Sequence, residues 1–347
     1  MPVAAISAVE AFSPAIEWTR RLLFRPFRLG VWLRFAVLGW LTGEVGGGGG
    51  SQLNLPLQYF REIGARHLRP PPHFPFSLWP LFLLLAVALG VLLLLLLYAG
   101  SVLRFALLEA VITGRVRLRE GFVRWRQPGL RLFVWRLVFS LLLFFLLLAV
   151  VGAAVFLAWA TGAFKEPRAH IAFLVLGGFL LFGVLFAIFV AGTSIWVLTK
   201  DFVVPIMALE RVGPGAGWSR LLPMLRAKPG SYLGYLGFKI LLALGSGMLL
   251  AAVSFILVLV LLVPAGIVAL LGYLLLRGGG LVWNAAALTA VIVSGSILLA
   301  MFLILFAFAS VPIVVFFQCF VLQFFAGRFD RLAEWMYPSP SPPPAPA

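Results

Sequence analysis

The residues near the amino terminus whose types and spacing could carry out chemistry are two charged residues and a run of glycines. Glu44 closes an apolar stretch in "LTGEVGGGGGSQLNLP", and an arginine precedes it by ten positions. Glycines unwind a helix, and an acidic side chain beside unwound backbone is how many membrane carriers build a binding site. The candidate polar site therefore consists of Arg34, Glu44, Gly46, Gly47, Gly48, Gly49 and Gly50.

Two placements of the glycine run remain open. If a weak internal repeat is in register, the first span begins at Phe35 and Glu44 lies roughly 15 Å into the membrane, where unwound backbone needs protein or a water-filled cavity around it. In the other placement the span covers residues 28–44, Arg34 lies inside it, and the glycines form an external loop. We favour the loop, because such a run usually forms a flexible connection and the amino-terminal copy of the repeat is the weakest.

Residues for catalysis, metal binding or cofactor binding are scarce. His67 and His73 lie on either side of a proline-rich segment without a third ligand, and no span carries a serine, aspartate and histidine set. Cys319 is the single cysteine, so neither an intrachain disulfide nor a cysteine metal site can form. The glycines of 213–217 lack the Lys-Ser/Thr of a nucleotide loop. We expect no catalytic, cofactor or metal site, and no enzymatic activity.

A basic stretch in the middle of the chain offers a second kind of site. The sequence "GRVRLREGFVRWRQPG" resembles other short basic stretches that each contain a tryptophan, at Trp18, Trp218 and Trp335. Guanidinium groups suit phosphate, and each arginine near an anionic leaflet adds about 1 kcal/mol of attraction. The candidate contacts to anionic lipid are Arg115, Arg117, Arg119, Arg124 and Arg126. The alternative is that these arginines only set the membrane topology.

The composition is that of a membrane protein. Of the 347 residues, 63% are hydrophobic and 11% are charged, and the mean hydropathy is +1.10. The elements that must position the candidate sites are therefore membrane helices, because each crossing of roughly 30 Å takes about 20 apolar residues. The fold class predicted is an all-α transmembrane bundle with six spans, at about 28–44, 79–104, 132–160, 171–199, 233–263 and 285–310. Residues 264–276 are a helix continuation or a re-entrant piece, and Pro205 and Pro312 are expected to kink their helices.

An internal repeat organises these spans into three helical hairpins. Seven residues that begin with Leu108 and Glu109 recur at one offset of 101, as Leu209, Glu210 and five others. A fainter copy relates Arg34 to Arg136. Each unit begins with a basic amphipathic stretch that we place at the cytoplasmic membrane surface. We predict a single transmembrane domain over 1–336 with units of about 10–110, 115–211 and 214–327, and a disordered proline-rich tail at 337–347.

The distribution of basic residues predicts the orientation. Of the 27 lysines and arginines, 21 lie at the chain ends or in the connections 104–136 and 200–239, whereas six lie in the loops 45–78, 161–170 and 277–284. The positive-inside rule places both termini in the cytoplasm and those three loops outside. We expect a multi-pass protein of the inner (cytoplasmic) membrane. The net charge of +16 reflects this topology, and we expect no nucleic-acid partner.

Three segments carry a resemblance to a known family. The segment "AIEWTRRLLFRPFRLGVWLRFAVLGWLTG", the glycine run with "LNLP" after it, and "DFVVPIMALERVG" resemble an uncharacterised family of prokaryotic polytopic membrane proteins. That family is distantly similar to the membrane domains fused to glycerophosphodiester phosphodiesterases. The resemblance implies a helical membrane domain and brings no catalytic residue with it.

Two functions of different classes follow from these features. The first is a non-enzymatic membrane protein that binds anionic lipid or an unknown protein partner through its cytoplasmic stretches. The second is a carrier of a small solute or lipid headgroup, with a polar site near Glu44 and the glycine run. A water-accessible cavity around the intramembrane charges would favour the carrier.

Overall fold

The computed structural model describes residues 6–44, 79–278 and 285–337, and every structural statement below concerns these residues. They form helices with no strand among them. Because the sequence is apolar over long stretches and has few interior glycine and proline breaks, several helices are very long. The helices are α1 (Phe12–Phe24), α2 (Leu29–Thr42), α4 (Trp79–Thr113), α5 (Leu118–Arg124), α6 (Arg126–Ala160), α7 (Ile171–Leu198), the π-helix η2 (Thr199–Val203), α8 (Val204–Glu210), α9 (Pro214–Ala227), α10 (Pro229–Gly278), α11 (Ala285–Ala326) and α12 (Asp330–Met336).

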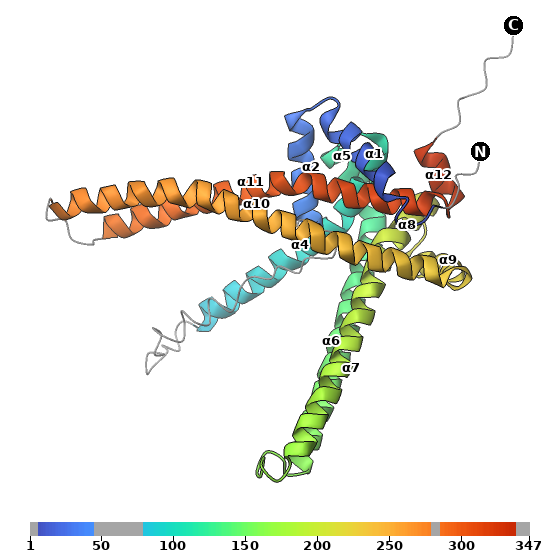
Figure 1. Ribbon diagram of the computed structural model, residues 1–347, viewed down its shortest axis with the longest axis horizontal. Coiled ribbons are helices and arrows are strands. Elements are labelled where there is room, and N and C mark those ends of the chain that lie inside the picture. Colours follow the sequence, from blue (N-terminus) through green and yellow to red (C-terminus); the bar gives the residue numbers. More distant parts are fainter. Residues whose placement is uncertain (1–5, 45–78, 279–284, 338–347) are drawn as a thin grey trace, which may run out of the picture.

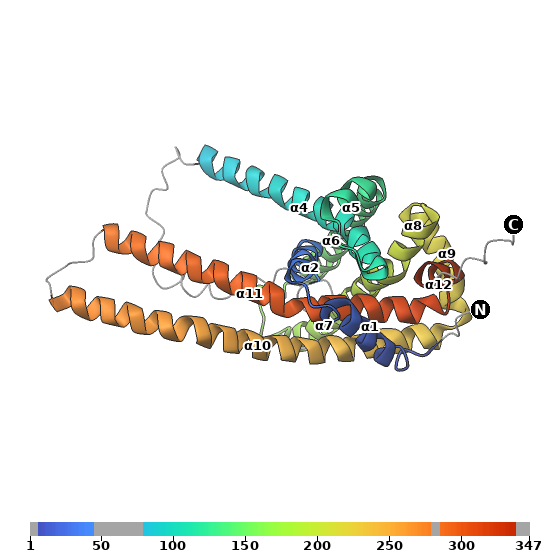
Figure 2. The same cartoon turned by 90° about the horizontal axis from the view of Figure 1, so that it is seen from above.

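The helices are arranged as a hub with three arms (Figure 1). We call hub the region where the short helices α1, α2, α5, α8, α9 and α12 gather around one end of the long helices. The arms are α4 alone, the pair α6 and α7, and the pair α10 and α11. Figure 2 shows α4, α10 and α11 extending from the hub. Both described chain ends lie at the hub, where the Arg328 Nη1 donates to the carbonyl oxygen of Ile6 at 3.0 Å.

Five apolar helical stretches, each of 34 to 40 residues, are long enough to cross a membrane. The helix that covers the first predicted span is shorter, because α2 has 14 residues and is therefore about 21 Å long. The structure thus supports a polytopic all-helical membrane protein with five long spans among the described residues. The five stretches are Pro80–Thr113, Arg126–Ala160, Ile171–Glu210, Pro229–Ile267 and Ile292–Ala326.

The two prolines of the third arm do not end its helices. Residues 264–276 continue α10 through Pro264, so the helix-continuation interpretation is confirmed and the re-entrant one is wrong. Pro312 likewise lies inside α11. Pro205 acts differently, because it has no N–H to donate to the carbonyl of Asp201 and is the second residue of α8, which follows η2. There the Val204 N–H bonds the carbonyl of Thr199, five residues earlier.

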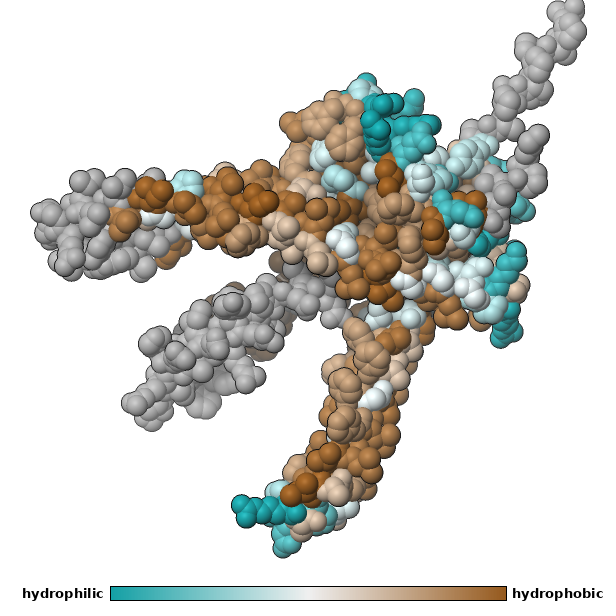
Figure 3. Space-filling view, viewed as in Figure 1, coloured by the Kyte–Doolittle hydropathy of each residue, from teal (hydrophilic) through white to brown (hydrophobic). Residues whose placement is uncertain are grey.

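The hydrophobic core lies in the hub. An aromatic cluster fills it, in which Phe202 contacts Tyr235, Phe324 and Phe325 at centroid distances of 5.0 to 5.9 Å. The small side chains of Ala11 and Ala15 are fully buried and let α1 lie close along α11. The described parts of the arms instead expose many apolar side chains, as expected for surfaces that face lipid, and Figure 3 shows these on the second and third arms.

Some sequence predictions fall outside the described residues. These are the fate of the glycine run, the loop 45–78 with two of the histidines, and the tail from 338 onward.

Candidate functional site

The turn that ends α2 positions Glu44. Gly43 has a φ of +72°, a conformation that glycine adopts without steric cost. The Gly43 N–H bonds the carbonyl of Trp40 and the Glu44 N–H bonds the carbonyl of Gly39, which is the Schellman arrangement of a helix carboxyl end. The turn directs Glu44 into the hub, where its side chain is buried.

Two cations from other helices meet the Glu44 carboxylate. Lys200 Nζ lies 2.6 Å from Oε2, and Arg104 Nη2 lies 3.1 Å from Oε1. Arg104 also donates to the carbonyl of Thr42 at 2.8 Å, so it neutralises both the acid and the negative carboxyl end of α2. All three charged side chains are at most 8% exposed. The contacts join α2, α4 and η2.

A second buried acid lies beside the first. Asp201 follows Lys200 in η2, forms an ion pair with Lys239 of α10, and accepts a hydrogen bond from the Tyr235 hydroxyl at 2.8 Å. Lys239 is near enough to Glu44 for their charges to interact. The π-helix η2 therefore places the oppositely charged side chains of Lys200 and Asp201 against two different helices.

Aromatic and arginine side chains extend this group toward the second arm. The ring of Trp196 lies between two guanidinium groups, with its centroid 5.3 Å from Arg104 and 4.7 Å from Arg136. Arg104 Nη1 is buried and has no hydrogen-bond partner among the described residues. We call the following set the charge cluster: Glu44, Arg104, Arg136, Lys200, Asp201 and Lys239. It holds four cations and two anions.

The structure brings together only part of the predicted polar site. Glu44 belongs to the charge cluster, whereas Arg34 Nη1 donates to the carbonyl of Val116 at 3.0 Å and takes no part in it. Sequence reasoning missed the partners of Glu44, because it treated Arg104, Lys200 and Lys239 as edges of spans. The sequence did indicate a buried charged site, because the charged pair Lys200–Asp201 lies between two apolar runs.

The predicted lipid-contact arginines lie on an exposed face of the hub. Arg117 pairs with Glu120 at 2.7 Å, and Arg124 pairs with Glu109 at 2.6 Å. Glu109 also accepts a hydrogen bond from the Trp125 indole at 2.6 Å, which fixes α5 against α4. In the described part of the chain the other three arginines, at 115, 119 and 126, form no ion pair. We call the five residues Arg115, Arg117, Arg119, Arg124 and Arg126 the arginine face; three of them line a pocket of about 410 Å³.

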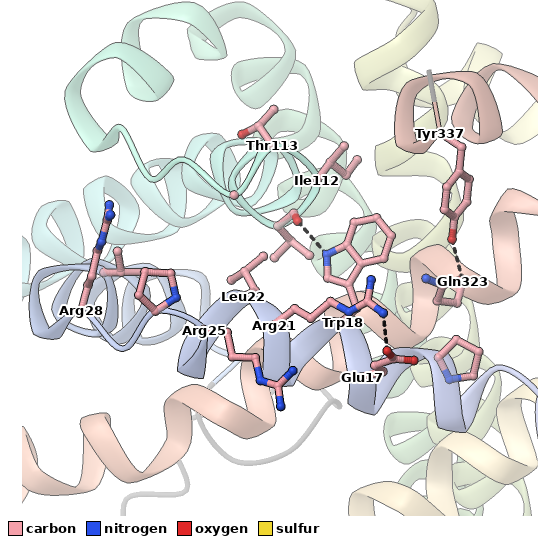
Figure 4. Close-up of a pocket in the computed structure, with 15 residues that line it drawn as sticks. Glu17, Trp18, Arg21, Leu22, Arg25, Arg28, Ile112, Thr113, Gln323 and Tyr337 are labelled. Carbon is pink, nitrogen blue, oxygen red and sulfur yellow. Dashed lines mark hydrogen bonds and ion pairs between the residues drawn. The ribbon is translucent and has the colours of Figure 1, made fainter. Parts of the chain in front are cut away.

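A second, larger pocket lies next to the pocket of about 410 Å³, and Thr113 lines both pockets. Its volume is about 580 Å³, and Arg21, Arg25 and Arg28 lie around it (Figure 4). The Trp18 indole donates to the carbonyl of Val111 at 3.3 Å and so ties α1 to α4. This side of the hub therefore presents arginines from α1, from the α1–α2 connection, and from α5 and its flanking residues.

Residues that could bind a metal ion are scattered over the described part of the chain. Among the residues that the structure describes, no group of three or more histidine, cysteine or acidic side chains could hold a metal ion. Cys319 is a buried free thiol. His170 lies at the tip of the second arm, where its Nδ1 is 3.2 Å from the carbonyl of Glu166.

Comparison with known protein families gives a match over nearly the whole chain. The sequence model described as "Family of unknown function (DUF7544)" matches residues 6–334, nearly the whole chain. No curated protein and no solved structure matches the chain.

Proposed function

Since the chain belongs to DUF7544, a family of unknown function, we propose its function from its structure: it is a non-enzymatic integral membrane protein whose hub binds anionic phospholipid. The observation that carries the proposal is the arginine face and the pocket beside it. The arginine face connects the hub ends of α4 and α6, so its guanidinium groups are on the headgroup side of these helices when the arms cross the membrane.

We further propose six crossings with both termini in the cytoplasm. The described ends of the chain lie together at the hub (Figure 1). Five long spans and the first predicted span, 28–44, which contains α2, make six crossings. This even number leaves both ends on one side. The excess of basic residues at the hub makes that side the cytoplasm.

The lipids that co-purify with the protein test the proposal. A variant with all five residues of the arginine face replaced by glutamine should retain at least about fivefold less phosphatidylglycerol, relative to phosphatidylcholine, than the wild type, because each arginine contributes about fivefold. A second variant with only Arg115, Arg119 and Arg126 replaced leaves the pairs of Glu109 and Glu120 intact and should lose part of this enrichment.

The control replaces Lys165 and Arg168 at the tip of the second arm with glutamine and should keep the wild-type ratio. Unchanged phosphatidylglycerol enrichment in a folded five-glutamine variant would contradict the proposal. Co-purification of a stoichiometric protein in place of lipid would contradict it as well, and would assign the arginine face to a protein partner.

A second function, a carrier for a small anion, is favoured by the charge cluster. Its cations outnumber its anions, and a π-turn carries two of its members; such turns occur often at functional sites. Uptake of radiolabelled inorganic phosphate into proteoliposomes tests this function. A carrier would show uptake above that of empty liposomes, which Lys239→Met would abolish, whereas uptake equal to that of empty liposomes would contradict it.

A further inference from the structure

An apolar groove runs along the outer side of α1, away from the arginine face. Its volume is about 880 Å³, and it lies between α1 and the third arm. Leu241, Leu242 and Leu249 of α10 line one wall, and Ile313 and Phe316 of α11 line another. From Leu241 to Leu249 the wall extends about 12 Å along α10, away from the hub.

The floor of the groove is effectively apolar, although two hydroxyl groups lie in it. Thr19 Oγ1 donates to the carbonyl of Ala15 at 2.7 Å, and Ser246 Oγ donates to the carbonyl of Ala243 at 3.1 Å. Each hydroxyl therefore already has a hydrogen-bond acceptor in its own helix and needs no ligand. Gly245 also lines the groove and leaves open space, because no heavy atom lies within 4 Å of where its Cβ would be. The groove can therefore accept an alkyl chain.

Two arginines, one in α1 and one directly after it, line the groove. Arg20 and Arg25 line it, are exposed, and form no ion pair with any other residue in the described ranges. Arg21, between them in sequence, differs because it pairs with Glu17. Figure 4 shows Arg21 turned toward Glu17 and Arg25 pointing away from Trp18. The groove thus has an apolar wall and a cationic rim, which complement an acyl chain and a phosphate.

We propose that this groove is a specific site for one anionic phospholipid, whose phosphate lies between Arg20 and Arg25 and whose acyl chain lies along Leu241–Leu249. The proposal rests on the proposed function and adds a defined site that shares no residue with the arginine face, although Arg25 also lines the pocket beside that face. A lipid is the occupant because the groove opens on the third arm, whose exposed leucine and isoleucine side chains face the hydrocarbon of the bilayer. The charge of the rim selects an anionic headgroup.

Native mass spectrometry of the purified protein with dioleoyl phosphatidylglycerol tests the phosphate part of the site. Replacing both Arg20 and Arg25 with glutamine should weaken the tightest bound lipid by about 25-fold, since each arginine contributes about fivefold. The control Arg226→Gln should keep wild-type binding, because Arg226 is an exposed arginine of α9 that lines neither the groove nor the pocket beside the arginine face. Wild-type affinity in the Arg20→Gln, Arg25→Gln double variant would overturn the proposal.

A second variant tests the acyl-chain part. Gly245→Leu places a side chain in open space of the groove, so the protein should fold with an unchanged melting temperature. It should reduce binding of dioleoyl phosphatidylglycerol at least fivefold and leave binding of the short dihexanoyl lipid unchanged. Equal loss of both lipids, or of neither, would overturn the groove assignment.

The two sets of arginine variants distinguish this proposal from the proposed function. If the arginine-face variant loses lipid and the Arg20, Arg25 variant does not, the groove site fails and the proposed function stands. If only the Arg20, Arg25 variant loses lipid, the groove is the lipid site and the arginine face only sets topology.

Discussion

At the scale of single residues, the charge cluster is the feature that most constrains the hub. Five of its six members are buried, and a buried charge is tolerated only when an opposite charge and hydrogen bonds compensate it. Glu44 compensates Arg104 and Lys200 together, so two cations depend on one carboxylate. Removal of that carboxylate should therefore cost more than removal of an exposed one.

Glu44→Gln should lower the free energy of unfolding by about 3 kcal/mol, because it leaves two buried cations without their counter-ion. Reversible unfolding in mixed micelles measures this change. Glu17→Gln is the matched control, since Glu17 also pairs with an arginine but the pair is exposed, and its loss should be too small to measure. Adding Lys200→Met to Glu44→Gln should restore part of the stability. Equal effects of Glu44→Gln and Glu17→Gln would show that the cluster is solvated.

At the scale of helices, close approach between neighbours depends on glycine at particular positions. Gly129 of α6 packs against α4, and a Cβ built there would lie 2.5 Å from Val102 Cγ2 and 2.6 Å from Val102 Cα. One of these atoms is backbone, so neither a rotamer change nor a small side-chain shift can relieve the overlap. Gly230, which the repeat offset of 101 relates to Gly129, has no atom within 4 Å of its Cβ position.

Gly129→Ala should therefore destabilise the protein by about 1–3 kcal/mol through overpacking between α4 and α6. Gly230→Ala should be neutral or stabilise the protein by up to about 1 kcal/mol, because alanine favours the helix. Thermal unfolding of both variants in detergent compares them directly. A loss of stability in Gly230→Ala as large as that in Gly129→Ala would contradict the packing seen between α4 and α6.

The sequence predicted the long helices well and their ends less well. Apolar runs of more than 20 residues have no alternative to helices in a membrane, so the spans from 79 onward all match helices. Each is longer than predicted, because charged residues such as Arg104 and Lys200 were read as membrane boundaries although the helices continue through them. Their partners could not be predicted, since Glu44 and Lys200 are 156 positions apart.

The repeat also shows that identical residues at equivalent positions can have different structural roles. Gly114 follows α4 with a φ of +67°, so its lack of a side chain is required there. Its counterpart by the same offset, Gly215, lies inside α9, and the left-handed residue after α8 is Arg211, with a φ of +57°. Glu109 and Glu210 do keep a common role. Each approaches an arginine of the short helix that follows, Arg124 at 2.6 Å and Arg220 at 3.7 Å.

At the scale of the whole molecule, the proposed function requires that the hub and the arm tips lie on opposite sides of the membrane. The arms expose leucine, phenylalanine and valine along their length, which only a lipid environment accommodates. Polar and basic residues gather at the hub and at the tip of the second arm (Figure 3). The arginine face and the lipid groove both require that the hub contact an anionic leaflet.

The side of the membrane on which two positions lie tests this topology. Pro167 lies at the tip of the second arm, whereas Gly215 lies in α9 at the hub (Figure 1). Reporter fusions truncated after each residue, with one enzyme active only in the cytoplasm and one active only outside, should place Gly215 in the cytoplasm and Pro167 outside. Reports from the same side for both fusions would contradict the hub-and-arm topology and the cytoplasmic lipid-binding function built on it.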